Sequence, residues 1–330
     1  MKNIVILATG GTIAGVSSSI TDTANYQPAI LPIEAITKDI AEPIRKVANI
    51  SSEQIAQIDS VEMTHQIWFT LANRINALLA SPQVDGAVVT HGTDTLEETA
   101  YFLNLVVKSD KPVVVVGAMR PASALSSDGP MNLYNAIILA ASDEATGKGV
   151  LVTLNNSINS SREVTKTNTS LQDSFKAPEL GYIGYLIEGE PHFYREPTRK
   201  HTYMSEFIID DLTCLPPVEI IYGHVGNMSA LAQAAVAAGA KGLVYAGMGN
   251  GNMSKMMKNT FMDIQEHGVV VVRSTRVSSG IVTRYGADND DLSNFIVSDT
   301  LNPQKSSILL SLALTRTTDP AEIQRMFWQY

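Results

Sequence analysis

The 330-residue sequence has little of several features that specialised proteins depend on. Its one cysteine, Cys214, cannot form a disulfide within the chain, which excludes a disulfide-stapled scaffold and zinc sites built from CxxC pairs. Lys and Arg number 24 against 33 Asp and Glu, and no basic run is present, so we expect binding neither to nucleic acid nor to an anionic membrane. No apolar run approaches the roughly 20 residues that span a bilayer.

The N-terminus also lacks the pattern of an export signal. Met1-Lys2-Asn3 leads into an apolar run of residues 4–8, which is shorter than the core of roughly 7–15 residues that a signal peptide needs. As written, the sequence predicts a cytoplasmic protein. A mature form that had lost its signal and gained a new Met would look the same, which leaves the periplasm as an alternative.

Hydrophobic residues make up 45% of the chain and charged residues 17%, a balance typical of a globular protein with a large core. Short β-branched runs alternate with segments of helical period, which indicates an α/β fold with buried parallel strands. The expected strands are 4–8, 86–90, 113–117, 150–154, 219–222, 243–246 and 269–273. We expect a larger N-terminal doubly wound, mostly parallel sheet domain (1–195), a linker (196–216) and a smaller C-terminal α/β domain (217–330).

Polar residues and glycines follow three of the expected strands, at the sheet edge where α/β proteins bind ligands. The segments are Thr9–Gly15, His91–Thr95 and Ala118–Pro121. The glycines of the first segment do not fit the G-x-G-x-x-G or P-loop fingerprints, which argues against a nucleotide site. They place Thr12 on a loop whose backbone N–H groups can face an oxyanion.

A threonine hydroxyl is a weak nucleophile and needs help from a base. Thr93-Asp94 stands at an expected helix start, where capping is the commoner role of such a pair. Lys166 can accept a proton from a hydroxyl if it lies near other cations or in a dry cleft, although a lone Lys is usually a solvated surface group. For His91 a packing role is commoner than that of a base. Asp128 reads as the N-cap of a helix over 131–141.

Other hydrolytic classes are disfavoured. The six His residues form neither H-E-x-x-H nor H-x-H, so we expect no metal, and no G-x-S-x-G elbow is present.

Several longer segments match one family. The chain resembles the bacterial-type L-asparaginases, nearer their type II branch, over residues 3–330. The segments that carry the resemblance are 8–15 (ATGGTIAG), 86–95 (GAVVTHGTDT), 111–120, 128–133, 165–168 (TKTN), 246–252 (AGMGNGN) and 301–305 (LNPQK).

The resemblance implies an L-asparagine amidohydrolase that forms L-aspartate and ammonia without a cofactor. By this resemblance Thr12 is the nucleophile and Tyr26 its hydroxyl partner, and Thr93, Asp94 and Lys166 activate the attacking hydroxyl or water. The substrate-binding residues that it implies are Gly11, Ser60, Val61, Gly92, Thr93, Asp94, Ala118, Asn250 and Asp288. It also implies a homotetramer, a dimer of dimers with sites at subunit interfaces, to which a neighbouring subunit contributes Asn250.

The sequence departs from the family pattern at two positions. Val61 stands where relatives usually carry Gln or Glu to bind the substrate's α-amino group. Because Val cannot hydrogen-bond, we expect weaker substrate binding and low glutaminase relative to asparaginase activity. The acidic residue that a neighbouring subunit usually contributes falls on Ala287 without a gap and on Asp288 with a one-residue slip, and we favour Asp288.

Two alternatives stay open. The asparaginase-like subunit of a tRNA-dependent amidotransferase shares these signatures but carries a further N-terminal domain, which we do not expect ahead of Ile4. A non-catalytic amino-acid-binding protein on the same fold would have no need of the Thr12, Thr93, Asp94 and Lys166 set.

Overall fold

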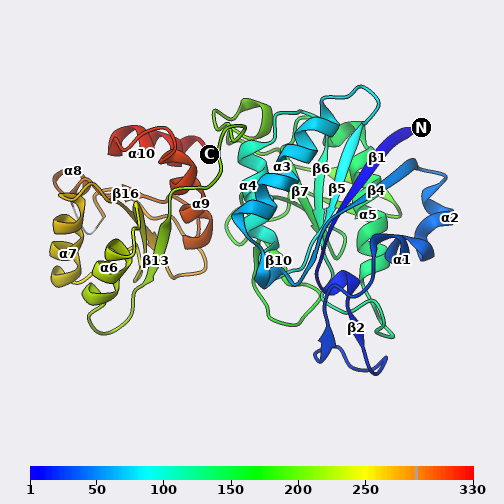
Figure 1. Ribbon diagram of the computed structural model, residues 1–330, viewed down its shortest axis with the longest axis horizontal. Helices are drawn as coiled ribbons and strands as arrows, with labels where there is room; N and C mark the ends of the chain where they lie inside the picture. Colours follow the sequence, from blue (N-terminus) through cyan, green and yellow to red (C-terminus); the bar gives the residue numbers. More distant parts are fainter. Residues whose placement is uncertain (287–288) are drawn as a thin grey trace. The chain divides into compact units, whose positions relative to one another are not determined.

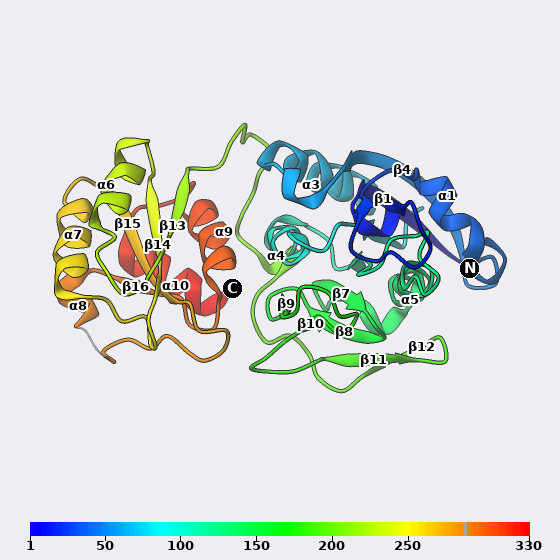
Figure 2. The same cartoon turned by 90° about the horizontal axis from the view of Figure 1, so that it is seen from below.

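The computed structural model describes residues 1–286 and 289–330, which divide into two compact units, Met1–Asp210 and Asp211–Tyr330. Each unit has its own sheet with helices on both faces (Figures 1 and 2). The larger unit precedes the smaller in the chain, which confirms the expected fold class. The limits 1–195, 196–216 and 217–330 stay a prediction. Among the described residues, no helix combines the length and apolar character needed to traverse a bilayer.

Unit 1 is built on an eight-stranded sheet in the order β12-β11-β8-β7-β6-β5-β1-β4. The five strands from β7 to β4 are parallel, and β8, β11 and β12 add antiparallel neighbours. The bounds are β1 (Lys2–Gly10), β4 (Ala48–Ile58), β5 (Gly86–Thr90), β6 (Val113–Val116), β7 (Val150–Leu154), β8 (Ser157–Ser160), β11 (Gly184–Ile187) and β12 (Glu190–Phe193).

The connections of unit 1 create a switch in strand order beside β1. From β1 the chain passes to β4 on one side and then returns to β5 on the other. In such sheets ligands bind beyond the carboxyl ends of the strands at the switch. The helices α3 (His65–Leu79) and α4 (Leu96–Val106) cover one face of the sheet. The helices α1 (Ile33–Thr37) and α5 (Gly129–Ala141) share a hydrophobic core with the other face.

Sequence patterning missed the strands β4, β8, β11 and β12 for physical reasons. The strand β4 (NISSEQIAQI in its last ten residues) lies at the sheet edge, contains four successive polar residues and is mostly partly exposed. The strands β11 and β12 form a hairpin at the opposite edge, where polar residues are tolerated because one side meets water. Only the central strands carry the continuous apolar runs that parallel strands buried on both faces require.

Unit 2 is a four-stranded parallel sheet in the order β13-β14-β15-β16. Its strands are β13 (Val218–Tyr222), β14 (Gly242–Gly247), β15 (Val270–Thr275) and β16 (Ile296–Val297). The helices α6 (Ser229–Ala237) and α7 (Lys255–Gln265) share a core with one face of this sheet, and α9 (Pro303–Ala313) and α10 (Pro320–Gln329) pack on it from the other side. The short helix α8 (Asp290–Ser293) precedes β16.

Candidate active site

Two glycines bring the loops that follow β1 and β5 into contact. A Cβ atom on Gly11 would lie 2.1 Å from the Cα of Gly92, and one on Gly92 would lie 2.7 Å from the Oγ of Ser60. Gly11 also has a φ of +82°, in the region that favours glycine. Only residues without side chains allow this approach, and it brings the segments of Thr12, Thr93 and Ser60 together at the switch in strand order.

Thr12 begins the short 3-10 helix η1 (Thr12–Ala14) directly after β1 and is buried. Its Oγ1 lies 2.7 Å from the hydroxyl of Tyr26. Tyr26 belongs to β3 (Tyr26–Gln27), which pairs with β2 (Val16–Ser17) in a small hairpin. Gly15 lies against the Tyr26 ring, since a Cβ there would be 2.9 Å from Cδ2. The structure therefore joins the Thr12 hydroxyl to that of Tyr26, the partner that the family resemblance implies.

Lys166 joins the second hydroxyl to a carboxylate. Its Nζ donates to Thr93 Oγ1 at 2.8 Å and to Asp94 Oδ1 at 2.6 Å. Because the Lys166 ammonium donates to the Thr93 oxygen, the Thr93 hydroxyl remains able to donate its own hydrogen to a second group. Asp94 does not cap the helix: Thr95 holds the N-cap position of α4, without a side-chain cap bond. The partner of Lys166 is an anion, not the neighbouring cation that sequence reasoning considered.

Ser60 and Val61 lie in the 3-10 helix η3 (Ser60–Glu62), just beyond the end of β4. Ser60 is buried, and its Oγ accepts a hydrogen bond from the backbone N–H of Asp94 at 3.2 Å. Its carbonyl accepts from Thr95 Oγ1 at 2.8 Å. The Val61 side chain is 59% exposed. Ser60 is thus held by the segment of Asp94, whereas Val61 is available to a ligand.

Ala118 lies in the loop after β6 and is fully buried. The carboxylate of Asp128 accepts from the backbone N–H groups of Met119 and Arg120, both at 3.0 Å. Asp128 stands at the N-cap position of α5, as the sequence predicts, yet makes no cap bond with its side chain. That side chain instead holds the loop that carries Ala118.

Sequence reasoning missed a supporting carboxylate, Glu97, on α4. This buried residue accepts from the backbone N–H of Lys166 at 2.6 Å. It lies 69 residues from Lys166 in the chain, so only the folded structure shows the connection. In the sequence, only its position in the first turn of α4, four residues after Thr93, could have indicated that Glu97 lies near the site.

A buried relay of hydrogen bonds supports the segment of Thr93. Trp68 Nε1 donates to Thr99 Oγ1 at 2.8 Å, and Thr99 Oγ1 lies 2.8 Å from Nε2 of His91. His91 Nδ1 lies 2.6 Å from the carbonyl oxygen of Gly92, which can only accept. Burial lowers the pKa of His91 to about 4. His91 is therefore a neutral packing residue with a proton on Nδ1, in its commoner role, and not a base.

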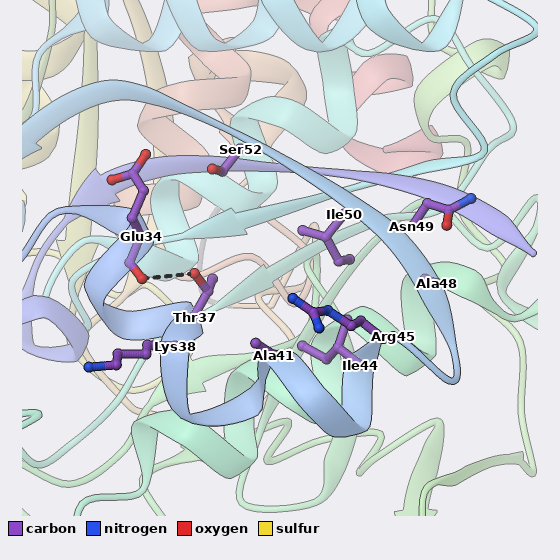
Figure 3. Close-up of a pocket in the computed structure, with 10 residues that line it drawn as sticks. All are labelled: Glu34, Thr37, Lys38, Ala41, Ile44, Arg45, Ala48, Asn49, Ile50 and Ser52. Carbon is purple, nitrogen blue, oxygen red and sulfur yellow. Dashed lines mark hydrogen bonds between the residues drawn. The ribbon is translucent and has the colours of Figure 1, made fainter.

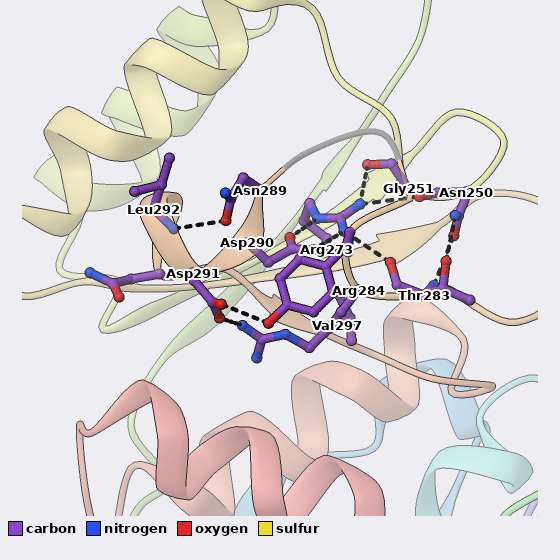
Figure 4. A network of polar contacts seen from close by, with 12 residues as sticks. Asn250, Gly251, Arg273, Thr283, Arg284, Asn289, Asp290, Asp291, Leu292 and Val297 are labelled. Carbon is purple, nitrogen blue, oxygen red and sulfur yellow. Dashed lines mark hydrogen bonds and ion pairs between the residues drawn. The ribbon is translucent and has the colours of Figure 1, made fainter.

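Unit 2 contains Asn250, which lies in the loop after β14. Its side-chain amide donates to Thr283 Oγ1 at 2.8 Å and accepts from the Thr283 N–H at 2.9 Å (Figure 4). The expected acid Asp288, with its neighbour Ala287, lies outside the described residues.

The arrangement in unit 1 can carry out nucleophilic chemistry. One hydroxyl pair, Thr12 and Tyr26, stands beside a second hydroxyl that is bonded to a Lys–Asp ion pair. A pocket of about 480 Å³ lies elsewhere in the unit, between α1, α2 (Ala41–Ile44) and the first half of β4 (Figure 3). None of the residues from the three motif segments lines this pocket, so we do not take it as the active site.

Comparisons with known proteins cover the whole chain. The family model "Asparaginase, N-terminal" matches residues 3–199, and "Glutaminase/Asparaginase C-terminal domain" matches residues 217–327. L-asparaginase 2 of Bacillus subtilis (strain 168) is 51% identical over all of this chain and 87% of its own. A glutaminase-asparaginase of Pseudomonas fluorescens biotype A is 47% identical, over all of this chain and 91% of its own. The crystal structure of a probable cytoplasmic L-asparaginase from Campylobacter jejuni is 46% identical, with a TM-score of 0.97 over both whole chains.

Proposed function

This chain belongs to the asparaginase family, and on that premise we propose that it hydrolyses L-asparagine to L-aspartate and ammonia with Thr12 as the nucleophile. The observation that carries the proposal is the pairing of Thr12 with Tyr26 beside the Lys166–Thr93–Asp94 cluster. A non-catalytic binding protein would have no use for two activated hydroxyls at one loop contact.

In the first step Thr12 Oγ1 attacks the side-chain amide carbon of asparagine. Its proton passes to the Tyr26 oxygen, which lies 2.7 Å away, and from there to the departing nitrogen. The C–N bond breaks, ammonia leaves and an aspartyl ester on Thr12 remains. Backbone N–H groups of the Gly-rich loop are suited to stabilise the developing oxyanion.

In the second step a water molecule attacks the ester carbonyl. It gives one proton to the Thr12 oxygen as the ester bond breaks, and L-aspartate is released. Thr93 orients this water through its hydroxyl, whose oxygen is fixed by the bond from Lys166. Lys166 is in turn held by Asp94 and, at its backbone, by Glu97.

The substrate's charged groups would be bound by the segments at the ends of β1, β4 and β5. Asp94 offers a carboxylate to the α-ammonium, and Gly92, Ser60 and Thr93 offer N–H or O–H donors to the α-carboxylate. Gly11, whose N–H donates to the Ile58 carbonyl at 2.9 Å, would contribute the close approach of its backbone. The carbonyl of Ala118 would accept a hydrogen bond from the amide. Exposed Val61 supplies only apolar contact, which supports low glutaminase activity.

The proposed assembly is a homotetramer, a dimer of dimers in which Asn250 and Asp288 of one subunit complete the site of another. Unit 2 supports an assembly because its edge strand β13 and the helix α6 leave Ile220, Tyr222 and Leu231 exposed. A parallel strand is normally buried on both faces. Light scattering should return four times the 35.6 kDa chain mass.

Ammonia release from L-asparagine tests the function. Thr12→Ala should lose at least about 10³-fold in kcat because the nucleophile is gone. Thr70→Ala is a matched control, since its exposed hydroxyl bonds only the carbonyl of Gln66 on α3. Ammonia release from asparagine without transfer to tRNA would set aside the amidotransferase alternative. Failure to release ammonia from any amino-acid amide would refute the hydrolase and favour the binding protein.

The cytoplasm remains the proposed compartment, with the periplasm as the alternative. The crystallised relative from Campylobacter jejuni carries the description "probable cytoplasmic". Fractionation of the source cells, with asparaginase activity followed in each fraction, tests this. Activity released by osmotic shock would contradict the cytoplasmic assignment.

A further inference from the structure

Unit 2 contains an ion pair that is almost completely removed from water. Arg273 on β15 and Asp290 at the start of α8 are 1% and 0% exposed. Arg273 Nε donates to Asp290 Oδ1 at 2.7 Å and Nη2 donates to Oδ2 at 2.8 Å (Figure 4). Burial of two charges is costly, and hydrophobic residues of similar volume often replace such a pair without loss. Stability of the fold is therefore a weak explanation for its presence.

The remaining hydrogen bonds of the pair go to two loops. Arg273 Nη1 donates to the carbonyl of Asn250 at 3.1 Å, and Nη2 donates to the carbonyl of Thr283 at 3.2 Å. Asp290 Oδ2 accepts from the N–H of Tyr285 at 2.9 Å. One planar guanidinium thus fixes the backbone of both loops relative to β15.

The two loops meet at the side chain of Asn250. Its amide bonds both the N–H and the hydroxyl of Thr283, which fixes the direction of the amide plane. Gly286 packs behind it, since a Cβ there would lie 2.3 Å from Asn250 Nδ2. Within residues 1–286 and 289–330 one N–H of the amide has no acceptor, and the residue is only half-buried. The amide is therefore oriented and still accessible.

We propose that the Arg273–Asp290 pair is a positioning device that holds the Asn250 amide in a fixed orientation for the substrate bound by a neighbouring subunit. The inference rests on the proposed function, from which it takes the meeting of Asn250 with substrate. A polar group on a surface loop binds weakly if it must first be ordered, and the buried pair does this ordering during folding. Arg273 and Asp290 act through Asn250 and touch no substrate themselves.

The first test displaces the amide without touching the ion pair. Asn250→Ala should lower kcat/KM for L-asparagine about 10–100-fold, the usual effect of losing a hydrogen bond to a charged ligand. Gly286→Ala should lower it about 10-fold, because the new methyl group occupies the place of the Asn250 nitrogen. The double variant should be no worse than Asn250→Ala alone, since the displaced group is already absent. Multiplying effects would overturn the proposal.

The second test breaks the pair itself. Asp290→Asn retains the volume but turns an N–H donor toward the guanidinium, so both loops lose their anchor. We expect kcat/KM to fall as in Asn250→Ala, with no further fall in the double variant. Phe261→Ala is the control, because it creates a cavity in the core of the same unit and lowers the melting temperature without touching either loop.

The outcomes separate the positioning role from general destabilisation. If Phe261→Ala, assayed well below its melting temperature, lost as much activity as Asp290→Asn, the pair would be merely structural. If Asp290→Asn fails to fold, Arg273→Lys takes its place, because it keeps the charge but cannot bond the carbonyls of Asn250 and Thr283 together, and an unchanged kcat/KM in that variant would overturn the proposal. An Asn250→Ala variant with full activity overturns the positioning role, while loss of activity in Thr12→Ala leaves the proposed function intact.

Discussion

Two ion pairs, one in each unit, have opposite environments. Lys166 and Asp94 are 2.6 Å apart with side chains 17% and 54% exposed, whereas Arg273 and Asp290 are 1% and 0% exposed. In the first pair the Asp94 carboxylate is more than half exposed, and Lys166 bonds its Oδ1. The second has its charged groups bonded to each other and to backbone groups of two loops. The exposed Asp94 carboxylate can bind a substrate, whereas the buried Arg273–Asp290 pair can only hold its surroundings in place.

The comparison makes opposite predictions for stability and activity. An exposed pair contributes little to stability because water and salt screen it. Removal of one partner from a buried pair leaves an uncompensated charge inside the protein. Loss of Lys166 should therefore affect the reaction more than the stability of the fold. Loss of either partner of the Arg273 pair should destabilise the fold and reach the reaction only through Asn250.

The largest effect should come from Lys166→Met. Without the ammonium, Thr93 loses the donor that fixes its oxygen, and we expect kcat to fall about 10³-fold or more. The unfolding midpoint should change little. Lys176→Met is a matched control, because Lys176 forms a 2.8 Å ion pair with Asp173 and lies on the neighbouring strand β10 (Phe175–Lys176). Equal losses of activity in the two variants would contradict the assignment.

Arg273→Met should have the next largest effect, on stability. It leaves the Asp290 carboxylate buried without its partner and should lower the free energy of unfolding by about 3–5 kcal/mol. Urea titration of Arg273→Met and of the wild type measures the loss of unfolding free energy. Arg325→Met, which breaks an exposed pair with Glu322 on α10, should leave the midpoint unchanged. A small effect of Arg273→Met would mean that water reaches the pair.

A third prediction concerns the buried hydrogen-bond relay of Trp68, Thr99 and His91, which supports the segment of Thr93. The pKa of His91 is lowered from 6.5 to about 4 by burial, so the unfolded chain binds a proton more readily than the folded one between these values. The stability that neutral His91 contributes is fully present above about pH 6.5 and is lost as the pH falls to about 4. The loss amounts to about 3 kcal/mol, since one unit of pKa corresponds to roughly 1.4 kcal/mol.

Urea titrations of the wild type and of His91→Gln between pH 7 and pH 4 measure this loss. Burial also lowers the pKa values of His65 and His201, so both proteins share that part of the pH dependence. The difference between them isolates His91, and the wild type should lose more stability. Parallel curves would show that His91 takes up its proton without unfolding.

The difference between local signals and contacts of distant segments explains which parts of the structure could be predicted from the sequence. The central strands and the loops after β1 and β5 were predictable because apolar runs and glycine motifs are local signals. The polar edge strand β4 had no such run. The positions of Trp68, Thr99 and Glu97 depend on how α3 and α4 pack, which no short motif encodes. Arg273 ends a Val-Val-Val-Arg run, and its partner Asp290 is 17 residues away across a loop.

Val61→Gln should have the smallest effect of the set, and it is confined to kinetics. Val61 is 59% exposed beside buried Ser60, so an amide there would meet water in the free enzyme and should leave the unfolding midpoint unchanged. In the complex it could accept a hydrogen bond from the substrate's α-ammonium, worth about 1 kcal/mol, or roughly a fivefold lower KM for L-asparagine. The gain should be larger for L-glutamine, whose longer side chain leaves its backbone groups less firmly held.

Steady-state kinetics with both amides measures the change at Val61. Val225→Gln, at a 95% exposed position in unit 2, controls for the added amide. An unchanged KM and an unchanged ratio of asparagine to glutamine hydrolysis would show that residue 61 does not face the α-amino group. In that case selection of the α-ammonium would rest on Asp94, whose side chain is 54% exposed, and on the acid proposed from the neighbouring subunit.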